Sequence, residues 1–168
     1  LEALMPGDRF PGVYAGYFNS IDPLVTAVCR LRQARGVYAT MNPVTPAVLA
    51  RANNRLRRAG RGTTTSDEDV TGRRWLLVDI DPVRPAGVSA SDEEREAAVQ
   101  RAAMIRDALR AEGWPDPVEA CSGNGRHLLY RVDLPRDDGQ LVRRCLAALA
   151  NRFDDDAVRI DKTVHNAA

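Results

Sequence analysis

Apolar and polar residues alternate along three short segments in the second half of the chain. In the segment 74–81, Leu76, Val78 and Ile80 share one face of a strand, and Asp79 and Asp81 share the other face with Leu77. The segments 127–132 and 158–164 alternate in the same way. Burying carboxylates without partners is costly, so the apolar face of each strand is predicted to pack on the core and the polar face to stay open.

Helical spacing of apolar residues fills the intervals between these strands. It predicts one helix over residues 91–112 and a second over 138–152, with a short strand at 118–121 and a tight turn at 122–125. The resulting order is strand, helix, hairpin, helix, strand. This is the split βαβ order of ferredoxin-like folds, in which both helices cover one face of the sheet.

The first part of the chain shows a simpler alternation of elements. Strands are predicted at 12–18 and 36–41, and helices at 21–35 and 46–56. The expected fold class is therefore α/β (α+β), with an N-terminal βαβα unit packed beside the βαββαβ half.

The domain organisation follows from these elements. We expect a single catalytic core over residues 1–168, made of an α/β unit at 1–58, a linking loop at 59–73 rich in Gly, Thr and acidic residues, and a half with RNA-recognition-motif-like topology at 74–168. The chain starts with Leu1, so we expect the core to be excised from a longer protein.

Composition narrows the class of protein. The chain has 168 residues, 44% of them hydrophobic, and a net charge of +1. No apolar run approaches the about 20 residues that span a bilayer, and no secretory signal is visible, so a cytoplasmic protein without a membrane partner is expected. Three scattered cysteines without a Cys-x-x-Cys pair predict neither disulfides nor zinc. Lys162 is the single lysine, so phosphate contacts must come from Arg, His, Lys162 or backbone amides.

Three aspartates are the candidate metal ligands. Asp79 and Asp81 are two residues apart on one strand, which separates them by about 7 Å on the same face. Asp161 on a neighbouring strand would add a third carboxylate, provided that its strand continues through Val164 so that Asp161 meets Asp81. Such a set can hold two Mg²⁺ or Mn²⁺ ions. A solvated strand end before a proline turn is the simpler alternative.

A glycine turn and a histidine are the candidate phosphate contacts. Asn124 and Gly125 are typical of a two-residue hairpin turn with positive φ at both residues. The amides of such a turn can bind phosphate oxygens, and His127 follows on the open face. The turn needs no function to explain it.

Arginines concentrate between the second and third predicted strands. They are either a solvated face or a track for the phosphates of a template strand. The candidates for weak nucleic-acid binding are Arg51, Arg55, Arg58, Arg61 and Arg74.

The ordered motifs hhhDhD, SGNGxH and hD resemble those of the archaeo-eukaryotic primase superfamily. More narrowly, the chain is similar to the bifunctional primase-polymerase domains of phage and plasmid replication proteins, including those of actinobacterial phages. The resemblance implies that Asp79, Asp81 and Asp161 bind metal, that Ser122 and His127 contact nucleotide phosphates, and that Gly123, Asn124 and Gly125 shape the turn. His127 is also expected among the catalytic residues.

The implied activity is template-directed nucleotidyl transfer from dNTPs or NTPs on a DNA template and primer, in a bacterial cytoplasm. A helicase domain is expected in the full-length protein. Because the chain ends before the basic segment that usually follows the third motif, primer extension is expected rather than de novo priming. A nucleotidyl cyclase and a nucleic-acid-binding module with an inactive site remain alternatives. With only two histidines, a histidine-hydrophobic-histidine nickase is excluded.

Overall fold

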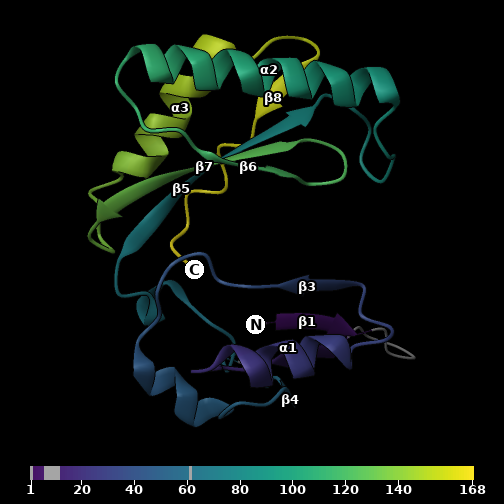
Figure 1. Ribbon diagram of the computed structural model, residues 1–168, viewed down its shortest axis with the longest axis vertical. Helices are drawn as coiled ribbons and strands as arrows, with labels where there is room; N and C mark the ends of the chain where they lie inside the picture. Colours follow the sequence, from purple (N-terminus) through teal and green to yellow (C-terminus); the bar gives the residue numbers. More distant parts are fainter. Residues whose placement is uncertain (1, 6–11, 61) are drawn as a thin grey trace. The chain divides into compact units, whose positions relative to one another are not determined.

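The computed structural model describes residues 2–5, 12–60 and 62–168 (Figure 1). The chain divides into two compact units, Leu1–Gly72 with Ala168 and Arg73–Ala167. It is an α+β protein with two four-stranded antiparallel sheets and three main helices. Within the described residues, no helix combines the length and the apolar character that crossing a bilayer requires.

The second unit has the element order that the sequence predicts. Its elements are β5 (Arg73–Pro82), α2 (Asp92–Ala111), β6 (Val118–Cys121), β7 (Arg126–Leu134), α3 (Leu141–Phe153) and β8 (Val158–Ile160). The strand order is β6-β7-β5-β8, so the first and third strands of the unit are central (Figure 1). The predicted order of strands and helices is confirmed for this half.

The core of the second unit follows the predicted alternation. Val78 and Ile80 of β5 are fully buried, whereas Asp79 and Asp81 between and after them are half-buried. Ile105 of α2 packs in the same cluster and is also fully buried. Each such side chain contributes about 1.5–3 kcal/mol of burial, which fixes β5 with its carboxylates on the face away from the helices.

The first unit differs from the expected βαβα arrangement. Its strands are β1 (Glu2–Met5), β2 (Gly12–Ala15), β3 (Gly36–Tyr38) and β4 (Arg57–Arg58), in the order β3-β1-β2-β4. Its helices are α1 (Ile21–Cys29) and the short 3₁₀ helices η1 (Pro46–Arg51) and η2 (Asp67–Asp69). The strands β1 and β4 were not predicted, and α1 ends earlier than the expected residue 35.

The predicted helix at 46–56 forms only over 46–51, as the 3₁₀ helix η1, because the backbone after it pairs with another segment. The Tyr17 amide donates to the Ala52 carbonyl, and the Asn54 amide donates to the Tyr17 carbonyl. Asn54 has a φ of 49°, which an α-helix does not permit. The chain then turns into β4 instead of continuing as a helix.

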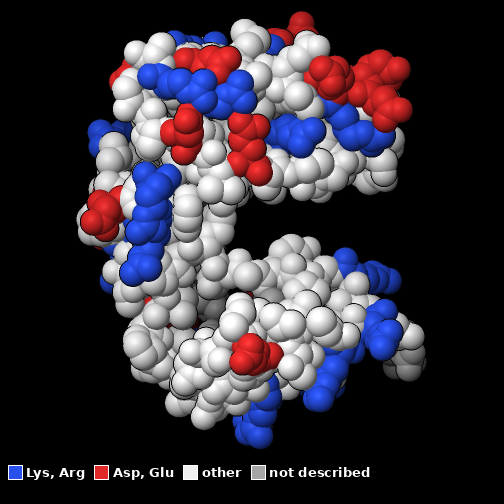
Figure 2. All heavy atoms as spheres, in the orientation of Figure 1, with Lys and Arg blue, Asp and Glu red and all other residues white. Residues whose placement is uncertain are grey.

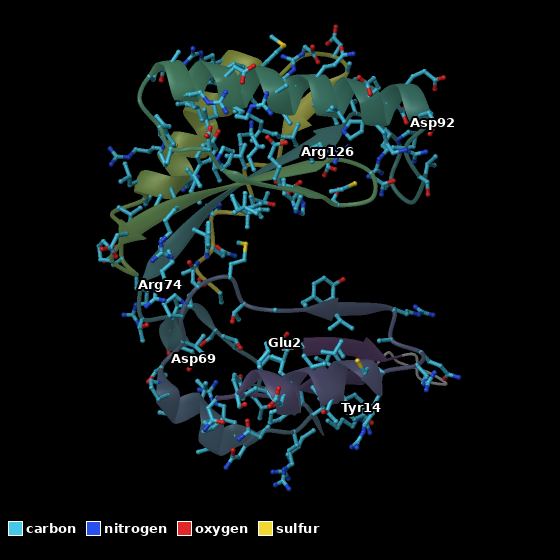
Figure 3. All side chains as sticks on the ribbon, viewed as in Figure 1. Glu2, Tyr14, Asp69, Arg74, Asp92 and Arg126 are labelled. Atoms are coloured by element: carbon cyan, nitrogen blue, oxygen red, sulfur yellow. The ribbon has the colours of Figure 1, made fainter. Side chains whose placement is uncertain are left out.

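The segment expected as a linking loop makes specific contacts in the first unit. Asp69 of η2 is buried and accepts two hydrogen bonds from the Arg51 guanidinium, each of 2.7 Å (Figure 3). Its Oδ2 also accepts from the amide and hydroxyl of Ser66. The bonds from Arg51 and then from Ser66 lower the pKa of Asp69 to about 2. This network anchors residues 66–69 beside η1.

Candidate active site

Three polar side chains lie in a row across the centre of the second sheet. His127 of β7 pairs directly with Asp79 of β5. On the other side of β5, the Asp161 amide donates to the Asp79 carbonyl at 2.9 Å, one step beyond the Ile80–Ile160 pair. Residues opposite each other in antiparallel strands project from the same face. The row of His127, Asp79 and Asp161 therefore lies on the face opposite the helices.

The predicted extension of the last strand through Val164 is wrong, because β8 ends at Ile160. Asp161 Oδ1 accepts bonds from the amide and the hydroxyl of Thr163, both at 2.7 Å, and this draws the chain into a turn. The shorter strand nevertheless does not remove Asp161 from the row. The register places Asp161 opposite Asp79 rather than Asp81, so the carboxylate reaches the row without a longer strand.

The Asp79 carboxylate is poorly solvated and incompletely partnered. Its side chain is 18% exposed, and its Oδ1 lies 3.2 Å from His127 Nε2. That approach is close enough for an ion pair but not aligned for a hydrogen bond, so Oδ1 is buried without a hydrogen-bond partner among the described residues. Burial raises the pKa of Asp79 to about 6, and the negative charges of Asp81 and Asp161 add to the increase while His127 opposes it. Such a buried oxygen is a place for a proton or a cation.

The raised pKa of Asp79 predicts a pH-dependent gain in stability for Asp79→Asn in EDTA. Between the ordinary pKa of 3.8 and about 6 the folded state binds more protons than the unfolded state, so the stability of the wild type falls as pH rises through this window. The amide removes the penalty, so Asp79→Asn should raise the free energy of unfolding by about 2 kcal/mol at pH 8 and by little at pH 4. Urea denaturation at both pH values measures this.

The control for this experiment is Asp133→Asn, which changes an exposed aspartate of the central strand β7. An equal gain for Asp79→Asn at pH 4 and pH 8 would show that the ionised carboxylate is not the destabilising group. A gain of the same size and pH dependence in Asp133→Asn would show that the effect belongs to net charge instead of to Asp79.

The glycine turn packs directly on the second carboxylate. A Cβ added at Gly125 would lie 2.2 Å from the Ile80 carbonyl oxygen and 2.5 Å from Asp81 Oδ1. Only glycine lets β7 approach β5 this closely at the end of the hairpin. The absence of a side chain at Gly125 therefore sets the position of the Asp81 carboxylate.

The prediction of positive φ at Asn124 and Gly125 is wrong. The positive φ, 96°, is at Gly123, and neither Asn124 nor Gly125 has one. The Ser122 amide donates to the Gly125 carbonyl at 3.3 Å, so Gly123 and Asn124 are the two central residues. Glycine at the first central position is the requirement of a type II′ turn. The pattern Ser-Gly-Asn-Gly allows either Asn124 and Gly125 or Gly123 and Asn124 to be the two central residues of the turn. The close packing of Gly125 on β5 selects Gly123 and Asn124.

The turn is tied together by groups that were expected to contact phosphate. The Gly125 amide donates to Ser122 Oγ at 2.8 Å, and the Gly123 amide lies 3.3 Å from Cys121 Sγ. Phosphate binding by these amides would have to replace those bonds. Asn124 Oδ1 accepts from the amide of buried Ala90 at 2.9 Å and so fastens the turn to the loop before α2. No spacing in the sequence indicates this contact.

The donor chemistry of the row fits magnesium or manganese. Within the described residues, no three His, Cys, Asp or Glu side chains form a group that could hold a metal ion as they stand. The unpartnered Asp79 Oδ1, together with Asp81 and Asp161 close enough to raise its pKa, is nevertheless an oxygen set of the kind that hard divalent cations prefer.

The candidate arginines do not share one role. Arg51 is committed to Asp69, and its guanidinium also lies 5.9 Å from the centre of the Tyr17 ring. Arg55 and Arg58 are exposed in the first unit, and Arg74 is exposed on β5 of the second (Figure 3). Arg61 lies outside the described residues.

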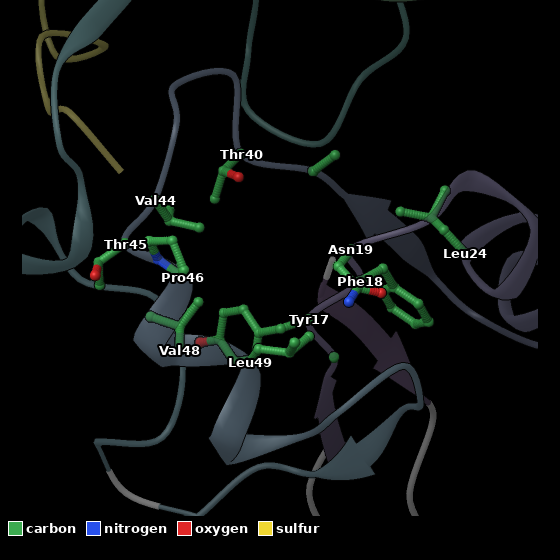
Figure 4. A pocket seen from close by; sticks show the side chains of 12 residues that line it. Tyr17, Phe18, Asn19, Leu24, Thr40, Val44, Thr45, Pro46, Val48 and Leu49 are labelled. Atoms are coloured by element: carbon green, nitrogen blue, oxygen red, sulfur yellow. The ribbon is translucent and has the colours of Figure 1, made fainter.

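A pocket of about 360 Å³ lies in the first unit, and the sequence did not indicate it (Figure 4). Its walls are largely apolar and include Tyr17, Phe18, Val48 and Leu49. None of its lining residues belongs to the row or to the glycine turn.

Comparison of the chain with protein-family models, with curated proteins and with solved structures finds no match in any of the three.

Proposed function

We propose that this protein is a metal-dependent nucleotidyltransferase that extends a primer on a DNA template, as the DNA primase-polymerases of the archaeo-eukaryotic primase superfamily do. The observation that supports it best is the row of His127, Asp79 and Asp161. Asp81 lies two residues after Asp79 on the same face of β5. Carboxylates of central strands beside a glycine hairpin turn are a suitable place for a triphosphate and its cations.

Each carboxylate has a distinct place in this proposal. Asp79, Asp81 and Asp161 would hold two Mg²⁺ or Mn²⁺ ions, which in such sites lower the pKa of the attacking hydroxyl and neutralise the charge of the triphosphate. The fixed backbone of β5 presents Asp79 and Asp81, while the turn after β8 presents Asp161. Positioning of the primer hydroxyl opposite the α-phosphate is the main contribution asked of the protein.

His127 and the hairpin turn would orient the nucleotide. His127 Nε2 is already at the row, 3.2 Å from Asp79 Oδ1, where it is placed to donate to a phosphate oxygen. Ser122 presents a hydroxyl at the start of the turn, which Gly123, Asn124 and Gly125 shape. We propose that the second unit is the RNA-recognition-motif-like, ferredoxin-like half of this fold and that the first unit is its N-terminal part. A helicase domain in the full-length protein would complete the replication enzyme.

A primer-extension assay tests the activity. A labelled primer on templates of defined sequence is incubated with each dNTP or NTP and with Mg²⁺, Mn²⁺ or EDTA. We expect incorporation only of the nucleotide complementary to the template, and none in EDTA. Incorporation that ignores the template would contradict a polymerase, and the absence of incorporation in every combination would contradict a nucleotidyltransferase of this type.

A nucleic-acid-binding module with an inactive site is the second candidate. It is favoured by the lack of a ready three-ligand metal group among the described residues and by the 3.2 Å approach of His127 Nε2 to Asp79 Oδ1. For such a module, the assay would show oligonucleotide binding without incorporation.

A further inference from the structure

A small hollow in the first unit is lined by three arginines. Its volume is about 210 Å³. Pockets that bind drug-sized ligands are larger, at about 300–1,000 Å³. Arg51, Arg57 and Arg58 line it together with Ala15, Tyr17, Ala52, Ala59 and Thr63. No carboxylate is among these residues, so the hollow suits a small anionic group.

Arg51 forms a fixed wall of the hollow. The two terminal nitrogens of its guanidinium, Nη1 and Nη2, donate to the two carboxylate oxygens of Asp69, and its charge is thereby neutralised. Tyr17 beside it is held by its hydroxyl, which lies 3.3 Å from both the Thr63 carbonyl and Thr65 Oγ1. These contacts hold one side of the hollow in place before any ligand binds.

Arg57 and Arg58 supply the uncompensated charge. They are the two residues of β4, opposite Ala15 and Tyr14 of β2, and both are exposed. Neither guanidinium makes an ion pair or a hydrogen bond with another described residue. β4 is at the edge of its sheet, so a ligand reaches both side chains without displacing a strand.

The surrounding charge favours a polyanion at this unit. Residues 51–61 contain five arginines and no carboxylate, and residues 1–72 have a net charge of +3 against −2 for residues 73–168. In Figure 2 the visible face of the first unit shows several basic side chains and little acid, whereas acidic and basic side chains are mixed over α2. A polyanion would therefore be attracted to the first unit rather than to the second.

We infer that this hollow binds a backbone phosphate of single-stranded nucleic acid, with Arg57 and Arg58 as the contacting cations and Arg51 with Tyr17 as the fixed wall. Guanidinium groups bind phosphate through paired N–H donors, and the contact does not depend on base sequence. The inference rests on the proposed function in one respect, since it names where the template or primer strand is held.

Binding of fluorescein-labelled oligo-dT to the full chain, followed by anisotropy in EDTA over a range of salt concentrations, tests the inference. Each phosphate contact on a single strand contributes about 0.7 to the slope of log K against log salt. Because the two arginines contact one phosphate, Arg57→Gln/Arg58→Gln should lower the slope by about 0.7. The same relation predicts about fourfold weaker binding at physiological salt. Arg32→Gln/Arg35→Gln, which removes two exposed arginines of the same unit, is the matched control and should change the affinity by less than twofold.

Three results would overturn the inference. An equal loss in both double variants would show a general charge effect. Unchanged oligonucleotide binding by Arg57→Gln/Arg58→Gln, with loss only of competition by inorganic phosphate, would assign the hollow to a free phosphate. Poly-glutamate at matched ionic strength should not displace the oligonucleotide from the wild type, and equal displacement would also contradict a phosphate site.

The same assay separates this inference from the proposed catalysis. If the wild type does not extend primers but Arg57→Gln/Arg58→Gln binds the oligonucleotide more weakly than the wild type, the phosphate site is supported and the proposed catalysis is not. If the wild type extends primers and Arg57→Gln/Arg58→Gln binds the oligonucleotide as the wild type does, only the phosphate-site inference is contradicted.

Discussion

Replacing Asp79 and Asp81 together by asparagine is expected to reduce nucleotide incorporation at least about 10³-fold, the scale of losing preorganised charge stabilisation at a reacting phosphate. Both side chains lie on one face of β5, and their neighbours on the other face, Val78 and Ile80, are fully buried, so the change removes charge while leaving the shape of the sheet intact. Single-turnover primer extension with saturating nucleotide measures the loss.

The matched control is Asp133→Asn, an exposed aspartate of β7 in the same sheet, which should extend primers at the wild-type rate. Thermal unfolding of the double variant should show a protein at least as stable as the wild type, because burial penalises the Asp79 charge. Incorporation within tenfold of the wild type would reject these carboxylates as the metal ligands.

Gly125→Ala is expected to destabilise the second unit by about 2–4 kcal/mol, in the range of severe packing changes in a core. The added methyl would meet the Ile80 carbonyl and Asp81 Oδ1 at distances that no atoms tolerate, so β7 must move away from β5 or the Asp81 carboxylate must swing aside. Either movement disturbs the site, and primer extension should fall together with the midpoint of urea denaturation.

Gly123→Ala is the matched control in the same turn. Its Cβ would meet nothing within 4 Å, so its cost comes only from the φ of 96° and should be about 1 kcal/mol. Equal losses for the two variants would show that turn conformation, and not the packing of Gly125 on β5, governs the position of Asp81.

The second unit was largely predictable because its strands alternate cleanly. In β5, Val78 and Ile80 are buried and Asp79 and Asp81 are not, as period-two alternation requires when one face is covered. The end of β8 was not predictable, since nothing in the alternation around Ile160 shows that the Asp161 side chain bonds to the next turn and stops the strand. The role of Gly125 depends on the neighbouring strand, which the local sequence does not contain.

The first unit was predicted less well because its pairings are non-local. β1 has only four residues and is placed by its neighbours β2 and β3, and two-residue β4 has no pattern of its own. The segment after η1 has helical spacing through Ala52 and Leu56, yet its backbone bonds to Tyr17 instead. Tertiary pairing therefore overrides a local preference here.

The residues of the row differ in how strongly the surrounding structure holds them in place. Asp79 and His127 belong to the long central strands, whose unfolding requires loss of the core. Asp161 is held by one backbone hydrogen bond and by its own turn at the end of a three-residue edge strand. Local opening of that turn costs far less than global unfolding. The position of the Asp161 carboxylate therefore depends on the turn after β8, whereas the position of Asp79 and His127 depends on the core.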